Sequence, residues 1–504
     1  MLKNTFLVTI FIVLSAVLGF FAQIVFASTF GASSEMDIYF KIFSVPAILT
    51  GISPIIFSSV LIPTFAKLKS DKLEINKFTH SMWILILVFV VIFVSVGFAA
   101  TALNINIFIP NVNAYSRQLG VHISLMIWIG SGFMIMSSFL SALLNYNKEF
   151  FKVAWTSILP SLSMIFFVIL FNKSIGVRSI AFGFCVGFIL QFIIFFKASK
   201  ISIKNFSFDF NHLPNKRLLL EQSFLVTLSL LPFTILAPIA YFWASKLEAG
   251  SISYLGYSQN FAGFLSVAVS MGISIVSFPE LADKFANKQG EPFLYKFEQS
   301  LRYVLLIAMF AAGSLFVLRT LILSVFYQRG SFGIEDVISL SNVLPWYLLA
   351  AIFVGCLNLL RTLFYSKQEF KKIALLGLLT PFIFFILAGI FKNIFSLVGI
   401  GIAYAMTFAA LFFISIYIAK NTESKFLTNN FYYFALKNTI AISAAIIFTS
   451  NCMHLFSNIL TQSTSILVSF FLFLLIYILF SKFLFKLKEI EEIFSLLKNK
   501  LKLS

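Results

Sequence analysis

Asp37 and Lys41 lie four residues apart in the stretch EMDIYFKIF, at the start of a long apolar run. This spacing places a carboxylate and an ammonium group on one face of a helix, one turn apart, where they can form an ion pair. Lys41 could instead run its aliphatic stem along the helix and place its charge at a membrane surface. Because charges inside apolar helices are rare and mark functional sites, the pair is a candidate for the lining of a polar cavity.

Three amide side chains lie inside other apolar runs. Gln23 follows SAVLGFFA, and Gln259 and Asn260 are adjacent in YSQNF. Amide groups are poorly suited to face lipid, so they predict either hydrogen bonds between helices or further cavity lining.

Cysteine and histidine predict neither a metal centre nor a disulfide framework. The three cysteines and four histidines are scattered through apolar stretches, and only Cys452 and His454 are close in sequence. Two ligands without further partners do not make a zinc site. We therefore expect no metal and no cofactor.

The elements that must position these polar residues are membrane-spanning helices. Hydrophobic residues make up 60% of the 504 positions, and the mean hydropathy is +0.98. A spanning helix needs about 20 apolar residues, because lipid offers no hydrogen-bond partner for the backbone. The sequence predicts an all-α polytopic membrane protein with about 14 transmembrane helices, near residues 5-28, 38-66, 81-103, 119-144, 152-171, 176-197, 223-244, 253-281, 301-325, 337-364, 373-391, 397-419, 432-455 and 463-485.

The distribution of cations predicts the orientation. If the N-terminus is cytoplasmic, 29 of the 37 Lys and Arg residues fall on inner connections and eight on or near outer ones. Both termini are then cytoplasmic, and the net charge of +18 is explained by inner loops beside an anionic leaflet rather than by a nucleic-acid partner.

Similar stretches recur roughly 220 positions apart, which predicts a duplication. The charged segment LLNYNKEFFK (143–152) resembles TLFYSKQEFKK (362–372), each between two apolar runs. SIAFGFCVGFILQFIIFFKASK (179–200) likewise resembles GIGIAYAMTFAALFFISIYIAK (399–420).

Two six-helix repeats in the same orientation imply two parallel bundles with a site between them, which is typical of a transporter. Two C-terminal helices fall outside the repeats. The predicted division is an N-lobe (1-200, spans one to six), a cytoplasmic linker (201-222), a C-lobe (223-420, spans seven to twelve), spans thirteen and fourteen (421-486) and a cytoplasmic amphipathic tail (487-504).

Prolines and glycine inside two spans predict bends. Pro232 and Pro238 each remove an internal hydrogen bond from span seven. Pro46 does the same in span two, where the flexible Gly51 follows it. These bends are either hinges that act in transport or static kinks that fit neighbouring helices.

Five stretches in order resemble the MurJ (MviN) family of lipid II flippases, within the multidrug/oligosaccharidyl-lipid/polysaccharide exporter superfamily. They are FGASSEMDIYF, LLNYNKEFFKVAWTSILPSL, SISYLGYSQNFAGF, VFYQRGSF and FYSKQEFKK. Gln328, Arg329 and Gly330 form the most specific of these signatures. The resemblance implies flipping of an undecaprenyl-pyrophosphate-linked peptidoglycan precursor, a cationic cavity, and a groove for the lipid tail formed by spans thirteen and fourteen.

The sequence departs from the family at the cavity. Ala16 and Ala22 in span one, and Thr50 and Gly51 in span two, stand where the family usually has arginine. Gln259-Asn260 replaces an Asp-Arg pair, while Asp37 is retained. Thr50 is therefore counted among the cavity residues. Lys41 could substitute as the cation that binds phosphate, the substrate could differ, or the chain could be a divergent paralogue.

We favour a lipid II flippase that works by alternating access, is monomeric, lies in the bacterial inner membrane, and contacts a polyprenyl-linked glycolipid and membrane lipids. Coupling could use a monovalent cation or the membrane potential. The alternatives are an exporter of another polyprenyl-linked glycan or small amphiphile, and a non-transporting scaffold. An enzyme is disfavoured, because the longest outer stretches offer only Glu335 and Asp336 as acids, at a predicted helix start.

The tail (487-504) alternates apolar and charged residues, which predicts an amphipathic helix on the inner membrane surface.

Overall fold

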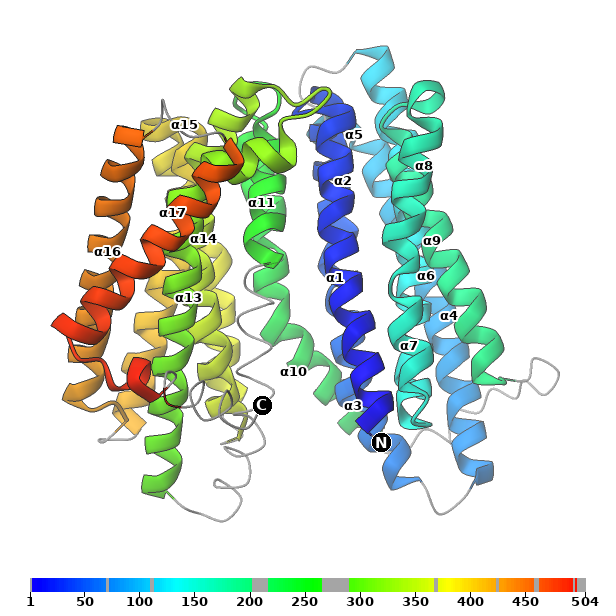
Figure 1. Ribbon diagram of the computed structural model, residues 1–504. Coiled ribbons are helices and arrows are strands. Elements are labelled where there is room, and N and C mark those ends of the chain that lie inside the picture. The colour runs from blue at the N-terminus through cyan, green and yellow to red at the C-terminus, as the bar shows by residue number, and fades with distance from the viewer. Residues whose placement is uncertain are drawn as a thin grey trace. The chain divides into compact units, whose positions relative to one another are not determined.

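A computed structural model describes residues 2–68, 72–108, 113–201, 216–264, 290–366, 370–422, 426–456, 462–492 and 495, and within these ranges every regular element is a helix (Figure 1). The all-α prediction is confirmed. Twelve helical segments in these ranges are long and apolar enough to cross a membrane. The predicted runs 373-391 and 397-419 share one of these segments, and most of the run 253-281 lies outside the described residues.

The chain divides into two compact units, which we describe separately. The first contains residues 1–256, 329–332 and 377–385, and the second contains 257–328, 333–376 and 386–504. Span seven (223-244), which the repeat pattern assigned to the C-lobe, packs with the first unit. Sequence duplication and packing therefore place this helix in different groups.

The helices of the first unit are α1 (Leu2–Phe30), α2 (Ser34–Thr50), α3 (Ser53–Lys67), α4 (Lys72–Leu103), α5 (Ile105–Phe108), α6 (Ala114–Tyr146), α7 (Phe150–Thr156), α8 (Leu159–Ile175), α9 (Arg178–Ser199), α10 (Lys216–Thr234) and α11 (Leu236–Ala244). Residues 251–264 are also helical, and the part up to Gly256 belongs to the first unit.

Helix α6 is the central helix of the first unit and packs against α2, α3, α4 and α9. Gly130 lets α9 approach closely, since a Cβ at this position would lie 2.7 Å from the ring of Phe184. Trp83 and Phe139 belong to a buried apolar cluster between α3, α4, α6 and α9. The large side chains of this cluster hold α3, α4, α6 and α9 together.

The second unit contains α13 (Gly290–Tyr327), α14 (Ile334–Ser366), most of α15 (Phe370–Thr422), α16 (Asn429–Phe456), α17 (Gln462–Ile478) and the π-helix η2 (Leu479–Leu484). Helix α13 packs against α14, α16 and α17. Ser396 interrupts α15 with φ 52° and ψ −130°, so this segment is two helices joined by a turn. The turn lies between the two runs that the sequence predicted.

Unusual backbone conformations recur at the same spacing as the sequence repeat. Gly176, between α8 and α9, has φ 58° and ψ −142°, which are close to the values at Ser396. Positions 176 and 396 are 220 residues apart. Gly31 and Gly250 also both have positive φ, and positions 31 and 250 are 219 residues apart. Because positive φ is confined to positions where a turn requires it, the matched pairs support the predicted duplication.

Spans two and seven are both interrupted. The break in span two lies at Gly51 and Ile52, between α2 and α3, one turn after Pro46. The break in span seven lies at Ile235, between Pro232 near the end of α10 and Pro238 in the first turn of α11. The predicted bends are therefore present, and prolines flank them because they remove backbone donors. Their gating role stays a prediction.

Candidate functional site

The Asp37 carboxylate binds the beginning of the helix over residues 251–264. Its Oδ2 accepts a hydrogen bond from the Gly250 N–H at 2.7 Å, and its Oδ1 accepts from the Ser253 N–H at 2.7 Å and the Ser253 hydroxyl at 2.6 Å. Gly250 also accepts the first bond of this helix, from the Tyr254 N–H. Gly250 is thus an N-cap residue without a side chain, and Asp37 supplies the missing capping oxygen from another helix.

Local sequence explains why α2 can present Asp37 in this way. Ser33 caps α2 with its own hydroxyl, which accepts from the Met36 N–H at 3.3 Å. Gly256, one turn after Ser253, has no side chain that would block the ring of Phe40, since a Cβ there would lie 2.8 Å from it. The two helices can therefore approach closely enough for a short carboxylate side chain to bridge them.

Lys41 lies one turn after Asp37 on α2 and is 7% exposed. The opposite charges of Lys41 and Asp37 attract each other, in agreement with their four-residue spacing. Burial of the side chain disagrees with a lysine that extends to water at the membrane surface. Lys41 thus places a positive charge inside the first unit.

Thr50 and Gln23 are both in the first unit but differ in how their polar atoms are used. The buried Thr50 hydroxyl donates to the Pro46 carbonyl of its own helix at 3.1 Å. Gln23, on α1, has a buried Oε1 without a hydrogen-bond donor among the described residues. The Thr50 hydroxyl is therefore bonded within its own helix, whereas Gln23 offers an acceptor oxygen.

Gln259 and Asn260 belong to the second unit, on the helical residues 251–264. Gln259 is half-buried and Asn260 is exposed. Their relation to Asp37 and Lys41, which are in the first unit, stays a prediction.

The signature Gln328, Arg329, Gly330 is followed by a serine that docks on the end of α1. The Ser331 N–H donates to the Ser28 carbonyl at 2.8 Å, and the Ser331 hydroxyl donates to the Thr29 carbonyl at 2.9 Å. Gly330 has φ 57°, and a Cβ there would lie 2.1 Å from the Ser28 oxygen. The last carbonyls of α1 are thereby satisfied by a loop about 300 residues away.

Gln328 and Arg329 themselves are exposed, whereas Phe332 is buried. The part of the signature that the structure explains is thus Gly330 with the serine and phenylalanine that follow it. The sequence identified the motif by resemblance, but the α1 carbonyls that it binds could not be read from the motif.

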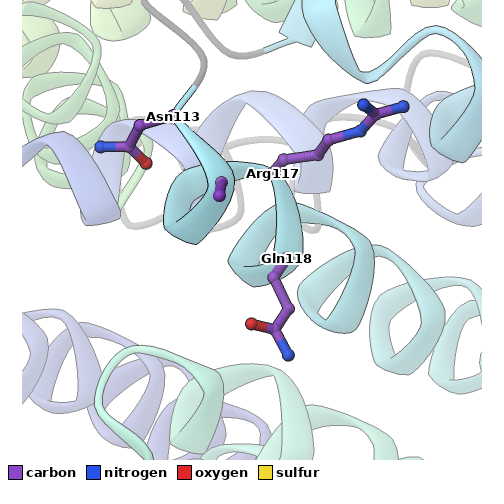
Figure 2. Close-up of a pocket in the computed structure, with 4 residues that line it drawn as sticks. Asn113, Arg117 and Gln118 are labelled. Atoms are coloured by element: carbon purple, nitrogen blue, oxygen red, sulfur yellow. The ribbon is translucent and has the colours of Figure 1, made fainter.

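Sequence reasoning missed the partners of Asp37 and a second polar contact on α2. The Tyr115 hydroxyl donates to Glu35 Oε1 at 2.8 Å, and the guanidinium of Arg178 lies 5.9 Å from the centre of the Tyr115 ring. Figure 2 shows a recess close to this contact, at the start of α6, lined by Asn113, Ala114, Arg117 and Gln118. Asn113 caps α6 through the Ser116 N–H at 2.6 Å, so the recess is the surface of a capped helix end.

These contacts can hold helices and charges in place, and a buried ammonium group can bind an anionic group. Nothing in them resembles a nucleophile beside a base. Among the described residues no cluster of three His, Cys, Asp or Glu side chains could hold a metal ion.

Comparison with known proteins places these features in a family. Residues 26–486 match the family model described as Lipid II flippase MurJ. A probable lipid II flippase MurJ of Buchnera aphidicola subsp. Acyrthosiphon pisum is 27% identical over 404 residues, which cover 76% of this chain and 78% of that protein.

Two solved structures share the fold. One is the lipid II flippase MurJ in an inward closed conformation, with a TM-score of 0.78 and 22% identity, covering 95% of this chain and 99% of that one. The other is an inward-facing multidrug resistance MATE family transporter of the MOP superfamily, with a TM-score of 0.64 and 13% identity over 81% of this chain and 96% of that one. The predicted fold is confirmed.

Proposed function

Because the chain belongs to the family of MurJ lipid II flippases, we propose that it moves lipid II, a polyprenyl-pyrophosphate-linked peptidoglycan precursor, from the inner to the outer leaflet. The polar headgroup cannot cross about 30 Å of hydrocarbon unaided, whereas the prenyl chain can stay in lipid. A protein that moves such a molecule needs a polar path inside an apolar helical scaffold, with positive charge for the pyrophosphate.

The buried ammonium group of Lys41 is the observation that best supports this function. Three donors at the start of the helical residues 251–264 bind the Asp37 carboxylate. Its negative charge is therefore stabilised by their dipoles as well as by Lys41. Lys41 therefore contributes positive charge where the family usually relies on arginine, and a lysine binds phosphate as a point charge.

Transport by alternating access needs helices that can bend. Pro46 and Gly51 flank the end of α2, and Pro232 and Pro238 flank the break between α10 and α11. A side chain of Gly51 would meet Thr234 at 3.8 Å, so the two breaks are neighbours in the first unit. We infer that they act together as a hinge, with Gln23, Thr50, Gln259 and Asn260 lining the polar path.

The charge of Lys41 also suggests how transport is driven. The membrane potential is worth about 2.3 kcal/mol per charge per 100 mV, so a moving cation couples the conformational change to it. A monovalent cation is the other candidate for coupling. We further propose that the chain is a monomer without enzymatic activity and lies in the bacterial inner membrane with both termini cytoplasmic. It contacts membrane lipids and no nucleic acid.

Complementation of a strain depleted of its own lipid II flippase tests this function. We expect the native chain and Lys41→Arg to restore growth, and Lys41→Ala to fail, because the pyrophosphate loses its cation. Lys173→Ala, at an exposed lysine of α8, is the matched control and should restore growth. Each variant is quantified in the membrane fraction by immunoblot. Failure of the inserted native chain would reject lipid II as the substrate, and rescue by Lys41→Ala would remove Lys41 from the mechanism.

A second function is favoured by the departures at the cavity. Ala16, Ala22, Gln259 and Asn260 make the site less cationic than the family usually has. Such a site suits another polyprenyl-linked glycan or a small amphiphile, or a paralogue that acts as a scaffold. Transport of a neutral amphiphile by the purified chain in vesicles, together with failure of complementation, would favour the exporter, and failure of both would favour the scaffold.

A further inference from the structure

A buried cluster of charges connects three separate parts of the second unit. Arg302, on α13, donates from Nη2 to Glu298 Oε1 at 2.6 Å and from Nη1 to Glu489 Oε1 at 2.8 Å. Glu298 and Glu489 are 7% and 6% exposed. One guanidinium group thus holds two buried carboxylates, one on its own helix and one beyond η2.

Glu298 also binds the start of α16. Its Oε2 accepts from the Thr428 N–H at 2.8 Å, and its Oε1 accepts from the Thr428 hydroxyl at 2.9 Å. Thr428 directly precedes α16, so a carboxylate on α13 satisfies a backbone donor at that helix end. The positions of α13 and α16 are thereby fixed relative to each other.

The chain folds back after η2 and brings Glu489 to the cluster. Lys486 has positive φ, and the Leu487 N–H donates to the Ser481 carbonyl at 2.9 Å. We call residues 487–492 the strap. Leu487 and Ile490 of the strap are 4% and 5% exposed, so they are buried in protein.

The amphipathic pattern of the tail 487-504 predicts a helix on the membrane surface, whereas the apolar side chains of the strap face protein. Glu492 reinforces this by accepting a hydrogen bond from the Tyr303 hydroxyl on α13. For residues 496–504, which lie outside the described residues, the membrane-surface helix stays a prediction.

A second polar tie holds the same helices farther along α13. The Tyr477 hydroxyl of α17 donates to Asn438 Oδ1 of α16 at 2.9 Å, and Asn438 Nδ2 donates to Met309 Sδ of α13 at 3.4 Å. Figure 1 shows α16 and α17 close together near η2 and diverging toward their other ends. Polar ties are thus concentrated where the two helices converge.

We propose that the Arg302 cluster is a charge-held latch, in which Glu489 holds the strap and the η2 end of α17 to α13, Glu298 holds the start of α16 to α13, and the other ends of α16 and α17 are free to separate. Apolar packing alone permits several registers, whereas a buried ion cluster is satisfied in one register, because displacing Arg302 leaves two buried carboxylates without their cation. Opening of the latch would therefore require Glu489 to leave Arg302. This conformational device goes beyond the transport function, and it rests only on contacts inside the second unit.

Cysteine labelling in the full chain tests the latch. Ile490→Cys reports on the strap, and Phe431→Cys, at a 3% exposed position in the first turn of α16, reports on the helix end. A water-soluble maleimide is added to the protein in nanodiscs, and labelling is counted above that of the native cysteines. We expect slow labelling of both reporters, and at least about tenfold faster labelling of both when Arg302→Met is added, because local opening then costs less.

Two more variants separate the latch from general unfolding. Glu489→Gln keeps the pair of Glu298 and Arg302, so it should speed labelling at Ile490→Cys and leave Phe431→Cys slow. Arg319→Met removes another arginine of α13, outside the cluster, and should change neither. Fast labelling of Ile490→Cys with an intact cluster would overturn the proposal. So would unchanged labelling with Glu489→Gln, or equal acceleration of both reporters by Arg319→Met.

Discussion

Replacing Asp37 with asparagine should destabilise the first unit by about 1–4 kcal/mol. The carboxylate accepts three hydrogen bonds, from the Gly250 N–H, the Ser253 N–H and the Ser253 hydroxyl. Asparagine offers one acceptor oxygen, so its amino group would face the Gly250 N–H and leave this buried donor unsatisfied, which costs about 1–3 kcal/mol. Loss of the negative charge at the helix start adds about 0.3–1 kcal/mol.

Ser253→Ala separates the hydroxyl bond from the backbone bonds. This variant removes one donor and leaves Asp37 with two N–H partners, so we expect a loss of about 1–2 kcal/mol. Asp336→Asn is the matched control, because the partly exposed Asp336 carboxylate also accepts from a backbone donor at a helix start, the Gly333 N–H, at 2.7 Å. Asparagine in the first turn of α14 can still accept this hydrogen bond through its side-chain oxygen, so this change should cost less than about 1 kcal/mol.

The measurement is the unfolding of purified protein in detergent micelles by added SDS, followed by far-UV circular dichroism. The order of destabilisation should be Asp37→Asn, then Ser253→Ala, then Asp336→Asn. If Asp37→Asn unfolds at the same SDS fraction as the native chain, or if Ser253→Ala costs more than Asp37→Asn, the capping role of Asp37 is wrong.

Backbone geometry gives two further predictions, measured by the same unfolding assay. Gly330→Ala should lower the free energy of unfolding by about 2 kcal/mol or more, because its Cβ would lie 2.1 Å from the Ser28 oxygen at positive φ. Gly333→Ala is the control and should cost little, because no atom lies nearer than 3.8 Å to its Cβ. Equal losses of stability would contradict the docking of this loop. Ser396→Gly should stabilise the chain by about 1 kcal/mol, and Gly176→Ser should destabilise it by about 1–3 kcal/mol, since both have the same strained backbone conformation. The reverse signs would mean that the two turns are not equivalent.

Hydropathy and local residue types were sufficient for the helical segments and their breaks. The prolines of span seven predicted a bend, and the helix is interrupted between them at Ile235. The turn at Ser396 lies between two predicted runs, although the helical assignment continues across it. Such features depend on about 20 consecutive residues in a solvent without hydrogen-bond donors, so a linear scan detects them.

The partners of the polar residues were not predictable in the same way. The spacing of Asp37 and Lys41 predicted their attraction, but the donors to Asp37 come from Gly250 and Ser253, more than 200 positions later. Resemblance identified Gly330 as part of a signature without indicating that it lies against Ser28. The amphipathic pattern of the tail fitted a membrane surface equally well as a protein surface.

The sequence by itself therefore determined that this is a membrane protein of helical spans, where those spans bend, and that it contains a repeat. Only the tertiary structure decided which polar groups meet. Asp37 binds a distant helix start, and Arg302 binds Glu298 on its own helix and Glu489, which lies far along the chain. The physical reason is that insertion into lipid is a sum over neighbouring residues, whereas a hydrogen bond needs two atoms within about 3 Å, and their separation along the chain carries no information about that distance.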